Sequence, residues 1–339
     1  MRPVFIYFMV LSFVACTAAR ACGQATDAGV YRVNVRLVTV DVQVSGKKSH
    51  KTVRDLRQDD FEIYEDGIRQ QISSISQDQL PLSIVFLFDL TDSVRPVLKS
   101  LALGAMKSLQ HLKPEDEVAV MAYSASARLI QDFTTDRALA VAAIEKASRM
   151  ESDEAAFFNE GIFQAANLLA RGHNPASRRV VIWLTDDIPN FPSEEIRARY
   201  GRSLGKAKLH TEAEATAELL HAGATVSTLL ERSRISDDEF SLRMSKAGST
   251  MLDTMRYPPG SVNKYAQASG GEVIETSRKH MQERLAFLID NLRLRYTLGY
   301  HPASVRQTGK YSTIKVKLTP EARKAAGEVT IAARRGYYH

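Results

Sequence analysis

The feature that most constrains this chain is a regular alternation of apolar runs with amphipathic segments between residues 82 and 292. The apolar runs are nearly continuous, as in strands that are buried on both faces of a parallel sheet. The segments between them repeat apolar residues at helical spacing. Strands that alternate with helices build βαβ units with right-handed crossovers. The sequence therefore predicts an α/β fold with a doubly wound, mostly parallel, Rossmann-like sheet.

The elements of this predicted domain follow one another with short connections, apart from two charged stretches. The predicted strands span 82–88, 118–123, 127–133, 179–184, 224–230 and 272–276. The predicted helices span 94–112, 137–148, 157–170, 211–222, 261–269 and 279–292. The charged stretches, 189–210 and 231–260, have no clear strand pattern and are predicted to be insertions or long loops.

Both flanks of this domain have the pattern of β-structure. Residues 30–80 contain alternating and β-branched runs, and Asp66-Gly67 between two of them predicts a hairpin. Residues 293–339 again show period-two and β-branched runs. We expect this C-terminal segment to pack with the N-terminal β unit. Together they would form a small β-sandwich that flanks the α/β domain of residues 82–292.

Residues 1–23 have the pattern of a secretory signal peptide. Arg2 is followed by an apolar run and then by small residues, and the run is shorter than the roughly 20 residues of a spanning helix. The pattern predicts export to the periplasm, the cell envelope or the medium. Two alternatives stay open, an uncleaved membrane anchor and a lipid on Cys16. The box before Cys16 only loosely resembles a lipoprotein signal, because Phe13 stands where leucine is usual.

Charge and cysteine content exclude several classes of function. Lys and Arg number 45 against 39 Asp and Glu, and they are interleaved rather than gathered in a basic stripe, which argues against nucleic-acid binding. Both cysteines, Cys16 and Cys22, lie in or beside the signal segment, so the folded part has no cysteine nucleophile and no disulfide. The chain also has no nucleophile elbow, no Walker loop and no histidine pair at zinc spacing. We therefore expect a binding protein and not an enzyme.

Polar residues follow two of the buried strands at the points where those strands end. Asp89, Thr91 and Ser93 come just after strand 82–88, and Asp186 follows strand 179–184. Ligands of open α/β sheets bind at the carboxyl ends of strands, where the strand order reverses. Carboxylate and hydroxyl oxygens suit Mg²⁺, and also Mn²⁺ or Ca²⁺. The sequence predicts a divalent cation site there; the alternative is that these residues cap helices.

At these residues the chain resembles the von Willebrand factor A (VWFA) domain. Asp89-Leu-Thr-Asp-Ser93 is similar to the Asp-x-Ser-x-Ser start of that family's metal-ion-dependent adhesion site, with Thr91 in place of the first serine. Leu184-Thr-Asp186 resembles the family's later strand-end aspartate. The flanking segments 58–67 and 294–302 look like those of exported von Willebrand A-related proteins of acidobacteria.

The resemblance implies a site at which Asp89, Thr91 and Ser93 hold an ion directly or through water, and Asp186 acts mostly through water. A carboxylate of a protein partner would fill the open position.

The sequence departs from the family at two points beside this site. Ala155, or Ala156 after a one-residue shift, stands where the family has a threonine ligand, and Ser152 or Asp153 replaces it only if the loop shifts. Asp187 follows where glycine is usual.

Three functions follow from these observations, and the first is preferred. It is an exported cell-envelope protein whose von Willebrand A-like domain mediates protein–protein interaction, through a degenerate adhesion site that captures an acidic side chain. The second is a metal-dependent, hydrolase-like enzyme with Asp89 or Asp186 in the catalytic role. The third is a metal-free scaffold, which the missing threonine supports.

Overall fold

The computed structural model of the chain describes residues 37–77, 80–91, 94–124, 126–150, 152, 157–185, 210–231, 262–303, 307 and 309–339. The predicted signal segment 1–23, with Cys16 and Cys22, lies outside the described residues. So do residues 189–209 and 232–260 of the two charged stretches.

A six-stranded sheet forms the centre of the α/β domain and confirms the predicted fold class. Its strand order is β10-β9-β8-β5-β6-β7, and every neighbouring pair is parallel except β6 and β7 at one edge. The strands are β5 (Leu82–Asp89), β6 (Glu117–Tyr123), β7 (Ala127–Thr134), β8 (Arg178–Thr185), β9 (Thr225–Glu231) and β10 (Val273–Thr276).

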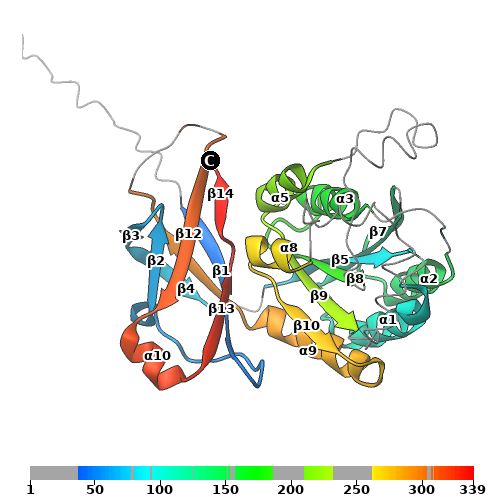
Figure 1. Cartoon of the computed structure of the whole chain (residues 1–339), viewed down its shortest axis with the longest axis horizontal. Coiled ribbons are helices and arrows are strands. Elements are labelled where there is room, and N and C mark those ends of the chain that lie inside the picture. Colours follow the sequence, from blue (N-terminus) through cyan, green and yellow to red (C-terminus); the bar gives the residue numbers. More distant parts are fainter. Residues whose placement is uncertain are drawn as a thin grey trace, which may run out of the picture. The chain divides into compact units, whose positions relative to one another are not determined.

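Helices cover both faces of this sheet because its central strands are apolar on both sides. All eight residues of β5 are buried, and they alternate between two cores. Phe86 and Phe88 pack with α1, α2 and α9, whereas Val85 and Leu87 pack with α3, α5 and α8. Figure 1 shows these two sets of helices on opposite sides of the sheet. The helices are α1 (Arg95–Ser108), α2 (Arg137–Ser148), α3 (Phe158–Ala170), α5 (Glu212–His221), α8 (Val262–Ser269) and α9 (Met281–Arg293), and the short helices η2 (Leu109–His111) and η3 (Arg278–His280) adjoin α1 and α9.

Strands from the N-terminal and C-terminal flanks pair with one another in two antiparallel sheets, as predicted from the sequence. One sheet has the order β13-β1-β11-β4 and the other β14-β12-β2-β3. In the first sheet β1 lies between two strands of the C-terminal segment, with Val38 opposite Tyr300 and Val42 opposite Ala333. The strands are β1 (Val38–Gly46), β2 (Phe61–Glu65), β3 (Ile68–Gln70), β4 (Ile72–Ser76), β11 (Tyr296–Tyr300), β12 (Tyr311–Leu318), β13 (Val329–Ala333) and β14 (Gly336–Tyr338), with the short helix η1 (Gln58–Asp60) before β2.

Local chemistry explains two of the connections in these sheets. Asp66 and Gly67 both have positive φ, 49° and 83°, and join β2 to β3 as the primed turn that this dipeptide favours. The helix α10 (Pro320–Ala326) follows β12 and was not predicted from the sequence. Thr319 caps α10 through its side chain, and Gly327 ends the helix at φ 74°.

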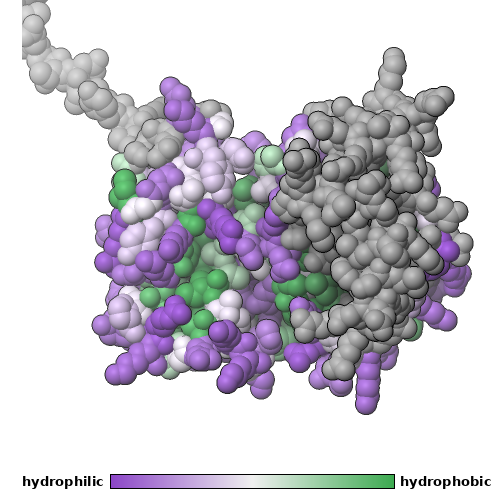
Figure 2. Space-filling view, viewed as in Figure 1, coloured by the Kyte–Doolittle hydropathy of each residue, from purple (hydrophilic) through white to green (hydrophobic). Residues whose placement is uncertain are grey.

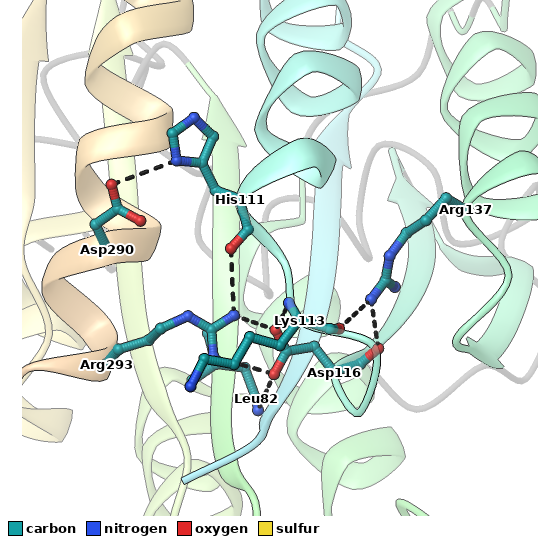
Figure 3. Close-up of polar contacts among 7 residues, drawn as sticks. All are labelled: Leu82, His111, Lys113, Asp116, Arg137, Asp290 and Arg293. Atoms are coloured by element: carbon teal, nitrogen blue, oxygen red, sulfur yellow. Dashed lines mark hydrogen bonds and ion pairs between the residues drawn. The ribbon is translucent and has the colours of Figure 1, made fainter. Parts of the chain in front are cut away.

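A buried ionic cluster holds the amino end of the central sheet (Figure 3). The Asp116 carboxylate is fully buried and accepts from the backbone N–H of Leu82 at 2.9 Å and of Lys113 at 2.6 Å. The Arg293 guanidinium pairs with the same carboxylate from the end of α9. Arg137 donates to the carbonyl oxygens of Lys113 and Asp116 at 2.6 and 3.0 Å. The contacts of Asp116, Arg293 and Arg137 join β5, α9 and α2 to the loop before β6, so the cluster is structural.

The face of the molecule drawn in Figure 2 is mostly polar in its described part. Figure 2 shows hydrophilic residues over much of the described part of that face, with smaller hydrophobic areas between them. None of the helices in the described ranges is both long enough and apolar enough to cross a membrane.

Candidate functional site

The carboxyl ends of β5 and β8 lie side by side at the point where the strand order reverses. Within the sheet, β6 lies next to β5 on one side of that strand, and β8, β9 and β10 follow one another on its other side. Phe88 lies opposite Leu184 in the parallel register, so Asp89 and Thr185 end their strands at the same level. This is the position at which open α/β sheets bind ligands. The strand-end residues Asp89 and Thr185 therefore meet there.

Asp89 is fully buried, and both of its oxygens accept hydrogen bonds from neutral groups. Oδ1 accepts from the backbone N–H of Thr91 at 3.0 Å and from the Thr91 hydroxyl at 2.7 Å. Oδ2 accepts from the hydroxyls of Tyr123 and Thr185, each at 2.8 Å. The carboxylate thus has one oxygen turned to the loop after β5 and one turned to the sheet interior.

The charge of Asp89 has no cationic counterpart among the described residues. Burial raises the pKa of Asp89, and the hydrogen bonds from Thr91, Thr185 and Tyr123 act in the opposite direction. A buried carboxylate is costly unless it is paired, protonated or bound to a metal ion. Its perturbed pKa at a sheet switch point is typical of a functional residue.

The donor set around Asp89 suits a hard cation. A hydroxyl that gives its hydrogen to a carboxylate keeps lone pairs that can bind a metal ion. Thr91 is in that position and is only half-buried. Oxygen ligands of this kind are those that Mg²⁺ prefers. The described part of the site therefore fits the predicted ion.

The remaining ligands predicted from the sequence are not placed. Ser93 and Asp186 lie outside the described residues, as do Asp153, Ala155, Ala156 and Asp187. Ser152 is described and half-buried. Within the described ranges no three His, Cys, Asp or Glu side chains come together as a metal-binding group.

The sequence did not identify the aromatic residues behind Asp89 as part of the site. Trp183, in the middle of β8, is fully buried. Its indole N–H donates to the Tyr123 hydroxyl at 2.9 Å. Its ring meets Phe158 of α3 edge-on, with centroids 5.0 Å apart, and Tyr265 of α8 at 6.1 Å. The available signal was the tyrosine that ends the apolar strand β6.

Residues 84–188 match the family of the von Willebrand factor type A domain. No match is found among curated proteins.

Solved structures with a similar fold have low sequence identity to this chain. One is the conserved hypothetical protein BatB from Bacteroides thetaiotaomicron, with 14% identity over 62% of this chain and 98% of that chain and a TM-score of 0.43. Another is a von Willebrand factor type A protein from Catenulispora acidiphila, with 12% identity over 90% of this chain and 74% of that chain and a TM-score of 0.42. A third is the vWF domain of the type V pili tip protein Mfa5 from Porphyromonas gingivalis, with 11% identity, coverage of 67% and 98%, and a TM-score of 0.40.

Proposed function

Because the chain contains a von Willebrand factor type A domain at residues 84–188, we propose that it binds a partner protein through the carboxyl end of its central sheet. The observation that carries this proposal is the position of Asp89. It is a buried carboxylate at the switch point of the sheet, held by four neutral donors and paired with no cationic side chain of the described residues. A group in this setting is suited to binding a positively charged ligand.

The positively charged ligand that we propose is a divalent cation, Mg²⁺ in the first place. Asp89 and Thr91 would hold it, together with Ser93 and Asp186 as the resemblance implies. Bound there, the cation would attract an acidic side chain of the partner protein. Tyr123 and Thr185 hold Asp89 from the interior and orient it. Alanine at 155 or 156 removes a hydroxyl that the family supplies, so we expect weaker binding than at a complete adhesion site.

One observation favours a second candidate, a metal-free scaffold. The protein's own donors already satisfy both oxygens of Asp89, so the carboxylate is stable to some extent without an ion.

A catalytic role for Asp89 has less support. The described groups that touch Asp89 are hydroxyls and one backbone amide, and none of them is a general base or a nucleophile paired with one. We therefore propose a binding protein and not an enzyme.

We also propose that the protein is exported and works in the cell envelope. This rests on the signal pattern of residues 1–23, with lipidation at Cys16 as the alternative way of retention at a membrane. Sequencing the amino terminus of the mature protein from cell fractions tests it. An intact Met1 on protein recovered from the cytosol would contradict export.

Calorimetric titration with Mg²⁺, Mn²⁺ and Ca²⁺ tests the cation site. We expect the wild-type protein to bind Mg²⁺ or Mn²⁺ and Asp89→Asn to lose that binding. Glu145→Gln is the matched control, because it also changes an acid to an amide but lies on the exposed side of α2. If neither the wild-type protein nor Asp89→Asn gives heat of binding with any of the three ions, cation-dependent binding of a partner is wrong. The metal-free scaffold is then the remaining candidate.

A further inference from the structure

A chain of two hydrogen bonds connects the buried core to Asp89, and this inference rests on the function proposed for that residue. The Trp183 indole N–H donates to the Tyr123 hydroxyl at 2.9 Å, and that hydroxyl lies 2.8 Å from Oδ2 of Asp89. All three residues are fully buried. Trp183 is the single tryptophan of the 339-residue chain.

The direction of both hydrogen bonds is fixed by chemistry. An indole N–H can only donate, so the Tyr123 oxygen accepts from Trp183. The hydrogen of the Tyr123 hydroxyl is then free to point at Asp89, whose ionised carboxylate can only accept. Trp183 thus sets the direction in which Tyr123 donates.

We propose that Tyr123 is the positioning residue of this site: directed by Trp183, it holds Oδ2 of Asp89 towards the interior and leaves Oδ1, beside Thr91, as the oxygen offered to a cation. Thr185 supports the same orientation with its own hydrogen bond to Oδ2. Among the described residues, both donors to Oδ1 come from Thr91, in the loop that follows β5.

This orientation has a consequence for which ion is preferred. Oδ1 also accepts two hydrogen bonds, but its described donors belong to Thr91 in the loop after β5, whereas the donors to Oδ2 lie in the sheet interior. An ion beside that loop therefore meets Oδ1 alone, and Asp89 cannot chelate it with both oxygens. Ca²⁺ sites commonly use bidentate carboxylates, whereas Mg²⁺ takes single oxygens in an octahedral shell and keeps several waters. Tyr123 therefore favours Mg²⁺ over Ca²⁺ at this site.

The first test needs no cation. The single indole N–H gives one resonance in a ¹H–¹⁵N NMR spectrum. We expect Asp89→Asn to move that resonance in the wild-type background, because the charge behind the Tyr123 hydroxyl is removed, and to leave it nearly unmoved in a Tyr123→Phe background. An equal displacement in both backgrounds would overturn the proposal.

Tyr265→Phe is the matched control for this test. It also removes a buried tyrosine hydroxyl from a ring that packs on Trp183, but that hydroxyl donates to Asn159 at 2.7 Å and not to Asp89. The displacement caused by Asp89→Asn must therefore persist in the Tyr265→Phe background. If Tyr123→Phe does not fold, the ¹³Cζ resonance of Tyr123 is followed in Asp89→Asn instead, and an unmoved resonance overturns the proposal.

The second test measures Mg²⁺ and Ca²⁺ affinity. We expect Tyr123→Phe to weaken Mg²⁺ binding about tenfold, the size of one hydrogen bond to a charged group, and to narrow the preference for Mg²⁺ over Ca²⁺. If the wild-type protein binds neither ion but shows the NMR coupling between Asp89 and Trp183, the proposed cation site is wrong. The orientation of Asp89 by Tyr123 would still hold. If wild type and Tyr123→Phe bind the ions equally and the NMR coupling between Asp89 and Trp183 is absent, the positioning role of Tyr123 is wrong. The proposed cation site would stand in that case.

Discussion

Two buried carboxylates lie at opposite ends of β5, and their surroundings differ in charge. Asp116 faces the Arg293 guanidinium beside the start of the strand, so its charge is compensated within the fold. Asp89 ends the strand, and its donors among the described residues are all neutral. Compensated buried charges are typical of structural clusters, and uncompensated ones of ligand sites. The contrast supports a structural role for the carboxylate at the start of the strand and agrees with the proposed binding role for the one at its end.

The structural carboxylate gives a prediction for stability. Asp116→Ala leaves the Arg293 guanidinium buried without its partner and two backbone N–H groups without an acceptor. Breaking a buried pair in this way costs about 3–5 kcal/mol. Urea unfolding measures the loss.

The control is Glu145→Ala, which breaks an exposed ion pair with Arg149 on α2. Such surface changes alter stability by about 0.5 kcal/mol or less. Equal midpoints for the two variants would show that the Asp116 cluster does not stabilise the fold.

At the scale of residues the sequence predicted the part of the site that is local. Asp89 and Thr91 stand out by their spacing after an apolar strand, and the structure joins them by a hydrogen bond. Tyr123 and Thr185 reach Asp89 only because β6 and β8 flank β5 in register. That register is a property of the assembled sheet, so the short-range pattern of the sequence does not contain it.

At the scale of elements, replacing a helical glycine by alanine is expected to have opposite effects on stability at two positions. A Cβ at Gly161 of α3 would lie 2.9 Å from carbon atoms of the Tyr123 ring, which is buried and cannot give way easily. A Cβ at Gly104 of α1 would meet its nearest atoms at 3.7 Å, an ordinary contact. Alanine is the better helix former by about 1 kcal/mol. Gly104→Ala should therefore raise the melting temperature, and Gly161→Ala should lower it.

The Gly161 variant also tests the connection between α3 and the site. We expect Gly161→Ala to push the Tyr123 ring and so to change the emission of Trp183, while Gly104→Ala leaves the emission unchanged. Unchanged emission in both variants, together with a raised melting temperature for Gly161→Ala, would mean that Tyr123 has room to move.

Helix α10 shows which elements the sequence analysis missed and why. Its signals were present: Thr319 at the cap, Pro320 at the first position and Gly327 after the end. The helix has seven residues and one buried side chain, Ala322, so it has almost no apolar periodicity. In contrast, strand β5 was predicted within one residue because burial on both faces leaves an unbroken apolar run.

The cap of α10 can be tested directly. Thr319→Ala removes the acceptor for the Ala322 N–H, which lies 3.3 Å from the threonine hydroxyl. Loss of such a cap costs about 1 kcal/mol. Thr319→Ser keeps an acceptor and should keep most of the stability in chemical unfolding. Equal losses for the two variants would assign the effect to the methyl group instead.

At the scale of the whole molecule, strands from both flanks share their sheets. The two flanks were predicted to pack together from their β-patterns, but the order of the strands was not. β1 lies between β11 and β13, and β2 pairs with β12. Of the strands in the N-terminal flank, only β2 and β3 pair with each other. Sequence shows which faces are apolar, whereas pairing across more than 200 residues depends on the folded domain between them.

Because the two halves of β1 pair with different strands, we expect them to respond differently when one of those strands is removed. Residues Val42–Gly46 pair with β13, and Val38–Val42 pair with β11. Deleting residues 329–339 removes β13 and β14 but leaves β11, so only one half of β1 loses its partner. Hydrogen exchange read by mass spectrometry should then rise at 43–45 and remain slow at 38–41, because unpaired edge amides exchange faster. Uniform exchange along β1 would mean that its two halves open together and that the sheet is one cooperative unit; full protection at 43–45 would contradict the strand order itself.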